Sequence, residues 1–177
     1  MEFDMTSYLE EERERQNMQR VDRIYRHPSY QAGLMQNKNA EKHRIYCRHN
    51  IQHFLDVARL AWIYNLERGL QLKKEMVYAA ALLHDIGRFR QYEEGIAHDV
   101  ASAELAEQIL PDAGFSEKET EEICDAILKH RNKELDEKGN LGDALRWADK
   151  KARRCYACEA EKTCYWKEEK KNLNLTW

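Results

Sequence analysis

The chain has few of the residues that interrupt helices: its 177 residues include only two prolines and seven glycines. Proline breaks the interior of a helix and glycine disfavours it, so their scarcity predicts long helices joined by few turns. No stretch approaches the roughly 18 consecutive apolar residues of a membrane span. The start, Met1-Glu-Phe-Asp-Met-Thr-Ser, lacks the basic-then-apolar pattern of a secretion signal. We therefore expect a cytoplasmic protein with no membrane partner.

The chain also lacks an excess of positive charge, because 29 Lys and Arg face 32 Asp and Glu and give a net charge of −3. A chain without a global positive field is a poor ligand for a nucleic acid polymer. Gly-rich phosphate loops and dinucleotide-binding fingerprints are absent as well. With 42% hydrophobic and 34% charged residues, the composition is that of one folded, helical domain.

Cysteines are few and odd in number: Cys47, Cys124, Cys155, Cys158 and Cys164. An odd count without a secretion signal favours reduced thiols over a disulfide framework. The last three form a C-x2-C-x5-C cluster, but a structural zinc normally has four ligands, and no Cys or His follows. Two interpretations stay open. The thiols are either spread around a terminal helix, or they bind a metal or iron–sulfur centre with a fourth ligand from elsewhere in the fold or from a second subunit.

Apolar residues recur with helical spacing along most of the chain. The pattern predicts helices over residues 6–26, Glu41–Arg68, Lys74–His84, His98–Leu110, Ser116–His130 and Leu141–Lys171, and connecting segments over Tyr30–Asn39, Phe89–Ala97 and Asp136–Asn140. No segment shows the sustained two-residue alternation of a half-buried strand. We therefore predict an all-α fold.

Three local signals refine these helices. Gly69 is placed to end one of them in a left-handed cap. Gly87 would let the backbone turn sharply. Ser116 and Glu119 form the sequence pattern of a capping box, which opens a helix.

The most informative motif is His84-Asp85, which ends the apolar run Tyr78–Leu83. Burial of an imidazole and a carboxylate beside packed apolar side chains requires compensation. A bare carboxylate is also unfavourable at the C-terminal end of a helix, where the dipole is negative. A divalent cation that binds nitrogen and oxygen together removes both difficulties.

Partners for this pair stand elsewhere in the chain. His53 lies in a helical pattern upstream, where His49 competes with it one turn earlier. Asp149 lies downstream in Leu145-Arg-Trp-Ala-Asp149, and Asp143 competes with it. His98 and His130 also stand at the polar edges of predicted helices, a position where a lone histidine is commonly solvated or hydrogen-bonded.

Together, "H…VA.LA", "ALLHDIG", "AI..H" and "L..AD" resemble the HD-domain superfamily of metal-dependent phosphohydrolases over roughly residues 41–152. The resemblance implies a single compact HD-domain helical bundle, preceded by an N-terminal helical segment (1–40) and followed by a C-terminal helix extension with the Cys cluster (153–177). It implies His53, His84, Asp85 and Asp149 as metal ligands. His98 and His130 would bind a second metal bridged by Asp85, or else contact phosphate or donate protons.

Arg88 follows the His-Asp turn and is the best candidate to bind a substrate phosphate with its planar guanidinium. Lys150, beside Asp149, is a weaker candidate. Arg44 and Arg48 are weaker still, because surface pairing with the abundant Glu explains them equally well.

A nitrogen and carboxylate ligand set suits Mn, Fe, Zn, Co or Ni, as one ion or two. Such a metal acidifies bound water, which predicts hydrolysis of a phosphate ester or anhydride of a nucleotide or small phosphorylated metabolite. Three alternatives stay open: an HD-type di-iron oxygenase, a non-catalytic nucleotide-binding regulatory module, and a helical scaffold whose cysteine cluster organises a partner. The catalytic residues would be Asp85, Arg88, His98 and His130. The sequence leaves the oligomeric state undetermined.

Overall fold

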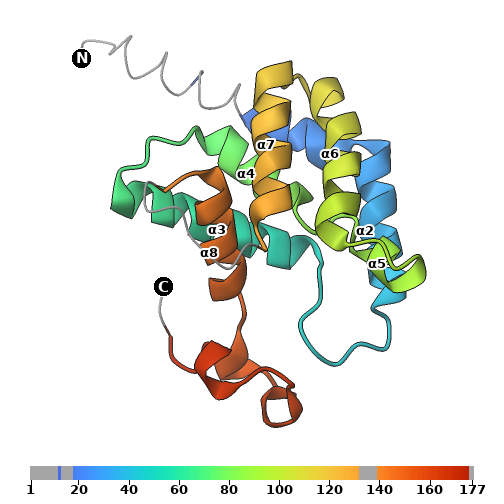
Figure 1. The fold of residues 1–177 in the computed structure, drawn as a ribbon, viewed down its shortest axis with the longest axis vertical. Coiled ribbons are helices and arrows are strands. Elements are labelled where there is room, and N and C mark those ends of the chain that lie inside the picture. Colours follow the sequence, from blue (N-terminus) through green and yellow to red (C-terminus); the bar gives the residue numbers. More distant parts are fainter. Residues whose placement is uncertain (1–11, 13–17, 132–138, 176–177) are drawn as a thin grey trace, which may run out of the picture.

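Helices joined by turns and irregular segments make up the computed structural model, which describes residue 12, residues 18–131 and residues 139–175 (Figure 1). Residues 18–26 are helical and precede α2 (Pro28–Ala40), α3 (Ile51–Arg68), α4 (Lys74–Leu83), α5 (Arg88–Glu93), α6 (His98–Ala113), α7 (Glu117–Lys129) and α8 (Leu141–Lys151). These described ranges contain no strand, which confirms the all-α prediction. None of the described helices combines the length and apolar character that a membrane span requires.

Helix α4 lies at the centre of the bundle, where it contacts α3, α6, α7 and α8. Its residues Ala79, Ala80 and Ala81 are fully buried, and such small side chains let neighbouring helices approach closely. Helix α3 packs along both α4 and α8, and α7 packs between α6 and α8 (Figure 1). The C-terminal end of α4, which carries His84 and Asp85, is therefore surrounded by other helices.

The predicted helix ends are confirmed where a capping signal marks them. Gly69 ends α3 in the left-handed conformation, with φ at 62°. Ser116 and Glu119 form the expected capping box of α7. Asn140 and Asp143 form a second capping box at the start of α8, in which the Asp143 carboxylate accepts from the Asn140 backbone N–H at 3.1 Å. Asp143 thus has a local structural role, unlike its rival Asp149.

Three predictions between residues 30 and 97 are wrong. Residues 30–39, predicted as a connecting segment, belong to α2, because Pro28 begins a helix as readily as it ends one. The helix predicted from Glu41 begins at Ile51, where the Asn50 side chain accepts from the His53 backbone N–H and caps it. The segment Phe89–Ala97, predicted as a loop, contains most of α5.

The predicted long C-terminal helix is also wrong. Helix α8 ends at Lys151, and residues 153–175 form three one-turn 3-10 helices, Cys155–Ala157, Glu161–Thr163 and Glu168–Lys170. None of the residues 153–175 is buried, so no apolar stripe stabilises a longer helix there. The first part of the helix predicted over residues 6–26 lies outside the described residues except for residue 12, as does the loop from Asp136 up to residue 138.

Candidate metal centre

Four predicted ligands from three parts of the chain converge at the end of α4. His53 projects from α3, His84 and Asp85 follow α4, and Asp149 projects from α8; one ligand atom from each lies within 4.8 Å of all the others. His53 Nε2 lies 3.4 Å from Asp149 Oδ1, and His84 Nε2 lies 3.7 Å from the same oxygen. The structure therefore brings together side chains from distant parts of the sequence, with His53 and Asp149 the farthest apart of the four.

A second group of ligand atoms lies on the other side of Asp85. It consists of Asp85, His98 at the start of α6 and His130 at the end of α7, again within 4.8 Å of one another. His98 Nε2 lies 3.2 Å from Asp85 Oδ1, whereas His84 Nε2 lies 3.5 Å from Asp85 Oδ2. The two carboxylate oxygens of Asp85 thus face different histidines, an arrangement with room for one cation or two.

Backbone carbonyls fix the orientation of two imidazoles. His84 Nδ1 lies 2.8 Å from the Ala81 carbonyl oxygen, and His130 Nδ1 lies 2.5 Å from that of Ile127. A ring nitrogen that faces a carbonyl carries the proton, which leaves the lone pair on Nε2. Both Nε2 atoms are therefore prepared to bind a cation.

Three buried polar atoms in the cluster have no hydrogen-bond partner: His53 Nε2, His84 Nε2 and Asp85 Oδ1. A buried polar atom without a partner costs about 1–3 kcal/mol, and more when it is charged. A divalent cation binds imidazole nitrogen and carboxylate oxygen together and would satisfy all three atoms. The residues present thus fit a divalent metal, as their chemistry predicts.

The electrostatics of the cluster favour positive charge at its centre. Burial lowers the pKa of His84, but the carboxylates of Asp85 and Asp149 outweigh it and raise that pKa to about 9. Burial raises the pKa of Asp85, but the surrounding histidines, His84 first, outweigh it and hold the pKa below its ordinary value. The carboxylates therefore stay ionised and attract a cation or a proton.

His98 has the opposite tendency. Its burial lowers its pKa to about 4, with Arg88 adding to the effect and Asp85 opposing it. The ring is therefore neutral at pH 7. Its Nδ1 lies 2.6 Å from Gln91 Oε1 and 2.7 Å from a guanidinium nitrogen of Arg88. Donation to Gln91 leaves Nε2 free to bind a metal, whereas acceptance from Arg88 places the proton on Nε2.

The sequence did not reveal the pairing of His49 with Glu41. His49 Nδ1 lies 2.5 Å from Glu41 Oε1, its backbone N–H donates to Glu41 Oε2 at 2.8 Å, and its Nε2 lies 3.5 Å from Asp85 Oδ2. Both His49 and His53 therefore face the cluster, although the group that contains Asp149 includes His53. Glu41 gave no signal, because residues 41–50 are not helical, and the helix predicted there does not describe how Glu41 meets His49.

Two further residues that the sequence did not reveal hold the turn after the His-Asp pair. The buried Asn37 donates to the Asp85 carbonyl oxygen at 2.9 Å and accepts from the Phe89 N–H at 2.8 Å. Ser102 Oγ accepts from the Gly87 N–H at 3.0 Å. Gly87 has φ of −88°, so its role is close packing and not a left-handed turn: a Cβ there would lie 2.6 Å from the Ala101 backbone.

A cavity of about 270 Å³ opens onto the cluster. Apart from Cys47, its remaining lining is basic and aromatic: Arg44, Arg88, Arg131, Lys150, Arg153, Tyr165 and Trp166. Arg88 lies 4.0 Å from Asp85 Oδ1 and donates from Nε to the Tyr92 hydroxyl at 3.3 Å, while Glu94 pairs with Arg90 instead. Arg88 and Lys150 therefore line the cavity as predicted, as does Arg44, whereas Arg48 lines a neighbouring one.

Comparisons with known proteins agree with this geometry. The family model of the HD domain matches residues 50–166. An "Uncharacterized protein" of Clostridium beijerinckii (strain ATCC 51743 / NCIMB 8052) is 41% identical over 158 residues, which cover 89% of this chain and 99% of that protein. Ribonuclease Y of Lawsonia intracellularis is 35% identical over 100 residues, 56% of this chain but 16% of that enzyme.

The fold is similar to that of a predicted HD superfamily hydrolase from an uncultured Thermotogales bacterium, whose crystal structure superposes with a TM-score of 0.55. The two proteins are 26% identical, and the match covers 81% of each chain. Both the sequence and the arrangement of helices are thus shared with proteins of one family.

Proposed function

The chain belongs to the HD domain family, and on this basis we propose that it is a metal-dependent phosphohydrolase acting on a nucleotide or another small phosphorylated metabolite. The observation that carries the proposal is the set of buried, unpartnered ligand atoms beneath a basic cavity. Cationic side chains bind phosphoryl oxygens, and the nitrogen and carboxylate cluster binds the metal that phosphate hydrolysis requires.

The ligands of the metal would be His53, His84, Asp85 and Asp149, with His98 and His130 completing a second position that shares Asp85. When bound, a divalent metal acidifies water and neutralises phosphoryl oxygens. The cluster contains no Ser or Cys, and burial raises the pKa of the Cys47 thiol that lines the cavity, so we expect direct attack by water without a covalent intermediate.

Arg88 would bind the phosphoryl group, because its guanidinium lines the cavity beside Asp85 and offers two parallel donors. Lys150 and Arg153 line the same cavity and would bind further phosphate oxygens. If the site binds one metal only, His98, held at its Nδ1 by Gln91 or Arg88, would instead transfer a proton at its Nε2. Asp85 stays ionised next to it and orients the ring.

The cavity also suggests the class of substrate. Its volume of about 270 Å³ is small among ligand pockets, which favours a mononucleotide or a smaller ester over a polymer. Tyr165 and Trp166 line it and provide apolar faces on which a nucleobase would stack.

The test is phosphate release from a panel of nucleotides, phosphomonoesters and a short oligoribonucleotide, with Mn²⁺, Fe²⁺, Zn²⁺, Co²⁺ or Ni²⁺ added to the metal-free protein. We expect turnover of at least one small substrate and none by Asp85→Ala, whose metal content should also fall. Asp125→Ala, a substitution of an exposed residue that pairs with Lys129, is the control. Oxygen consumption by the iron-loaded protein without phosphate release would instead support the oxygenase, and cleavage of the oligoribonucleotide alone would contradict a small substrate.

A further inference from the structure

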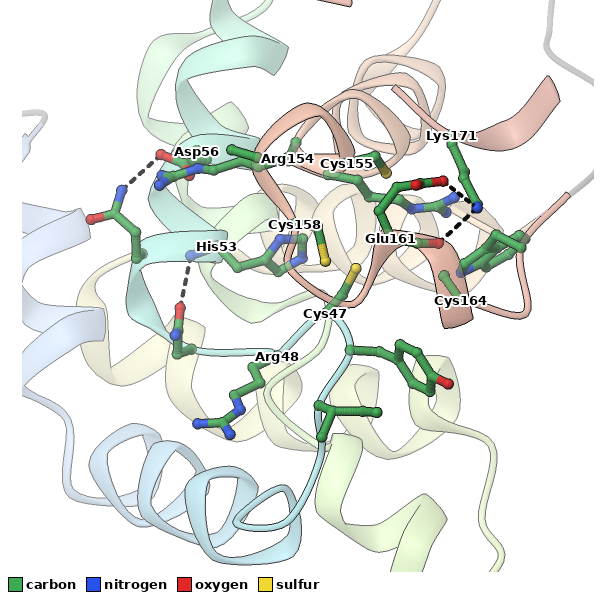
Figure 2. A pocket seen from close by; sticks show the side chains of 18 residues that line it. Cys47, Arg48, His53, Asp56, Arg154, Cys155, Cys158, Glu161, Cys164 and Lys171 are labelled. Atoms are coloured by element: carbon green, nitrogen blue, oxygen red, sulfur yellow. Dashed lines mark hydrogen bonds and ion pairs between the residues drawn. The ribbon is translucent and has the colours of Figure 1, made fainter. Parts of the chain in front are cut away.

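Four of the five cysteines line one cavity of about 300 Å³ beside the metal centre (Figure 2). Three of them, Cys155, Cys158 and Cys164, come from the C-terminal segment, and Cys47 comes from the segment before α3. The fold therefore supplies the fourth thiol that the C-x2-C-x5-C spacing lacks. All four are free, and the fifth cysteine, Cys124, is buried beside the Ala103 carbonyl.

Two 3-10 turns carry the three cysteines of this segment. Cys155 begins a 3-10 turn that Cys158 ends, and the Cys158 N–H donates to the Cys155 carbonyl at 3.2 Å. Cys164 ends the next 3-10 turn in the same way, donating to the Glu161 carbonyl at 3.2 Å. Figure 2 shows Cys47 facing the turn that carries Cys158.

The C-terminal segment has no core of its own. None of the residues 153–175 is buried, and exposed contacts tie the segment to the domain, such as the Tyr46 hydroxyl, which donates to the Thr163 carbonyl at 2.8 Å. A short segment without a core requires a covalent or metal cross-link for a defined conformation. A metal centre bound by four thiolates provides that free energy when it forms.

The separation of the sulfurs distinguishes two kinds of centre. A single zinc ion with bonds of ~2.3 Å holds its four thiolates less than about 4 Å apart. In the part of the chain that the structure describes, the groups of three or more ligand atoms within 4.8 Å of one another are those of the His and Asp cluster, so no three of the four sulfurs are that close to one another. A 4Fe–4S cluster suits such a separation, because each thiolate binds a different iron.

We propose that Cys47, Cys155, Cys158 and Cys164 bind a 4Fe–4S cluster that anchors the C-terminal segment to the domain. Electrostatics agree with this proximity: burial raises the pKa of the Cys47 thiol, Arg153 opposes the rise, and the three other thiols add to it. The soft thiolates prefer iron–sulfur or zinc centres, whereas the nitrogen and oxygen ligands of the neighbouring cluster do not.

The position of this centre gives it a structural role in the neighbouring cavity. Arg153 and Trp166 line both cavities, and the Arg153 guanidinium lies 4.3 Å from the centre of the Trp166 ring. The cluster would hold these two side chains, and with them one wall of the substrate cavity. This inference concerns a different set of ligands from the proposed hydrolytic site and does not depend on hydrolysis.

The test is anaerobic purification, or reconstitution with ferrous iron and sulfide, followed by assays of iron, acid-labile sulfide and visible absorption. We expect about four irons and four sulfides per chain beyond any iron in the His and Asp site, and an absorption that dithionite bleaches. Cys47→Ser and Cys158→Ser should lose the sulfide and the absorption. Cys124→Ser and Asp85→Ala should keep both, which separates this centre from the hydrolytic one.

Wild-type protein that binds no labile sulfide under these conditions would overturn the proposal, whether or not the cysteine variants fold. One zinc ion per chain, lost on substitution of any of the four cysteines, would overturn the cluster in favour of a zinc site. In folded Cys124→Ser protein, which lacks the buried fifth thiol, we also expect a thiol reagent to modify four fewer cysteines than after removal of the cluster in denaturant. Equal reactivity in both states would contradict the proposal.

Discussion

Asp85 links the two halves of the candidate metal centre, because each of its carboxylate oxygens faces a different histidine. Two histidines beside Asp85 differ in the direction of their pKa shifts. His84 has a pKa raised to about 9, whereas burial and nearby cations lower that of His98 to about 4. At the scale of single residues, the site thus provides a neutral imidazole, an ionised carboxylate and, at its rim, a permanently charged Arg88.

The number of metal ions depends on the two histidines at the far side of Asp85. If the centre binds two ions, His98→Ala or His130→Ala should reduce the metal content from about two per chain to about one, because each removes a ligand of the second group. Elemental analysis of the purified variants measures this ratio. An unchanged ratio with lost activity would assign both histidines to substrate binding or proton transfer.

Arg88→Ala should reduce kcat/KM by roughly one to three orders of magnitude and leave the metal content intact. The reason is the loss of charge-assisted hydrogen bonds to phosphate, worth ~1.5–3 kcal/mol each. Arg88→Lys should recover part of the activity, since an ammonium lacks two parallel donors. Arg90→Ala is the control, because Arg90 pairs with Glu94 and Glu104. Kinetics of Arg88→Ala equal to those of this control would remove Arg88 from the site.

At the scale of elements, the end of α4 is held in place by its neighbours. Asn37 on α2 contacts both the Asp85 carbonyl and the Phe89 N–H, and Ser102 on α6 contacts the Gly87 N–H. These three hydrogen bonds fix the backbone that presents Asp85. A turn of five residues is therefore positioned by two helices distant from it in sequence.

Asn37→Ala should lower the free energy of unfolding by roughly 1–3 kcal/mol, because it leaves the buried Phe89 N–H without a partner. It also removes one of two hydrogen bonds to the Asp85 carbonyl, which keeps the one from the Arg88 N–H. Denaturant unfolding measures the loss. Asn39→Ala, an exposed position on the same helix, is the control and should change stability little. A variant at position 37 as stable as this control would show that water replaces the amide.

The capping box of α7 predicts a dependence of stability on pH. Burial raises the pKa of the Glu119 carboxyl. The hydrogen bond from the Ser116 backbone amide, together with Arg20 and Lys73, outweighs burial and lowers that pKa from 4.5 to about 2. The stabilisation is therefore complete above about pH 4.5 and disappears as the pH falls toward 2. Glu119→Gln should cost roughly 1 kcal/mol at pH 7 and almost nothing near pH 2.

Urea unfolding of Glu119→Gln across this pH range checks the prediction, with the exposed Glu121→Gln as the control. A stability difference between Glu119→Gln and the wild type that stayed constant from pH 7 to pH 2 would show that the carboxylate charge contributes nothing.

At the scale of the whole molecule, the candidate ligands join the bundle across its centre. They come from α3, from the ends of α4 and α7, from the start of α6 and from α8. A cation at this position would link five helices that are otherwise held by apolar packing and backbone contacts. Metal binding and folding are then coupled.

Removal of divalent metal with a chelator should therefore lower the melting temperature by several degrees. Binding to the folded state alone contributes roughly 2.7 kcal/mol when the free metal is 100 times its Kd. Thermal unfolding with and without the chelator, followed by addition of Mn²⁺, measures the shift. Asp85→Ala should show no such shift. The same shift in Asp85→Ala as in the wild type would locate the stabilising metal elsewhere in the chain.

Local sequence signals determined several features of the protein. The apolar spacing, the left-handed cap at Gly69 and the capping box at Ser116 identified helices, because these effects act within a few residues. The pair His84-Asp85 marked the site, because two polar groups at the end of a buried helix require a compensating partner. The resemblance of the surrounding motifs supplied the distant His53 and Asp149.

Only the tertiary structure decided which residues support that site. Glu41, Asn37 and Ser102 act through hydrogen bonds across long sequence separations, and no periodicity encodes such contacts. Residue spacing predicted a helix that continues after Lys151, and this prediction is wrong. No such helix forms because none of the residues 153–175 is buried. Packing, which local spacing does not specify, also brought Cys47 to the other three thiols.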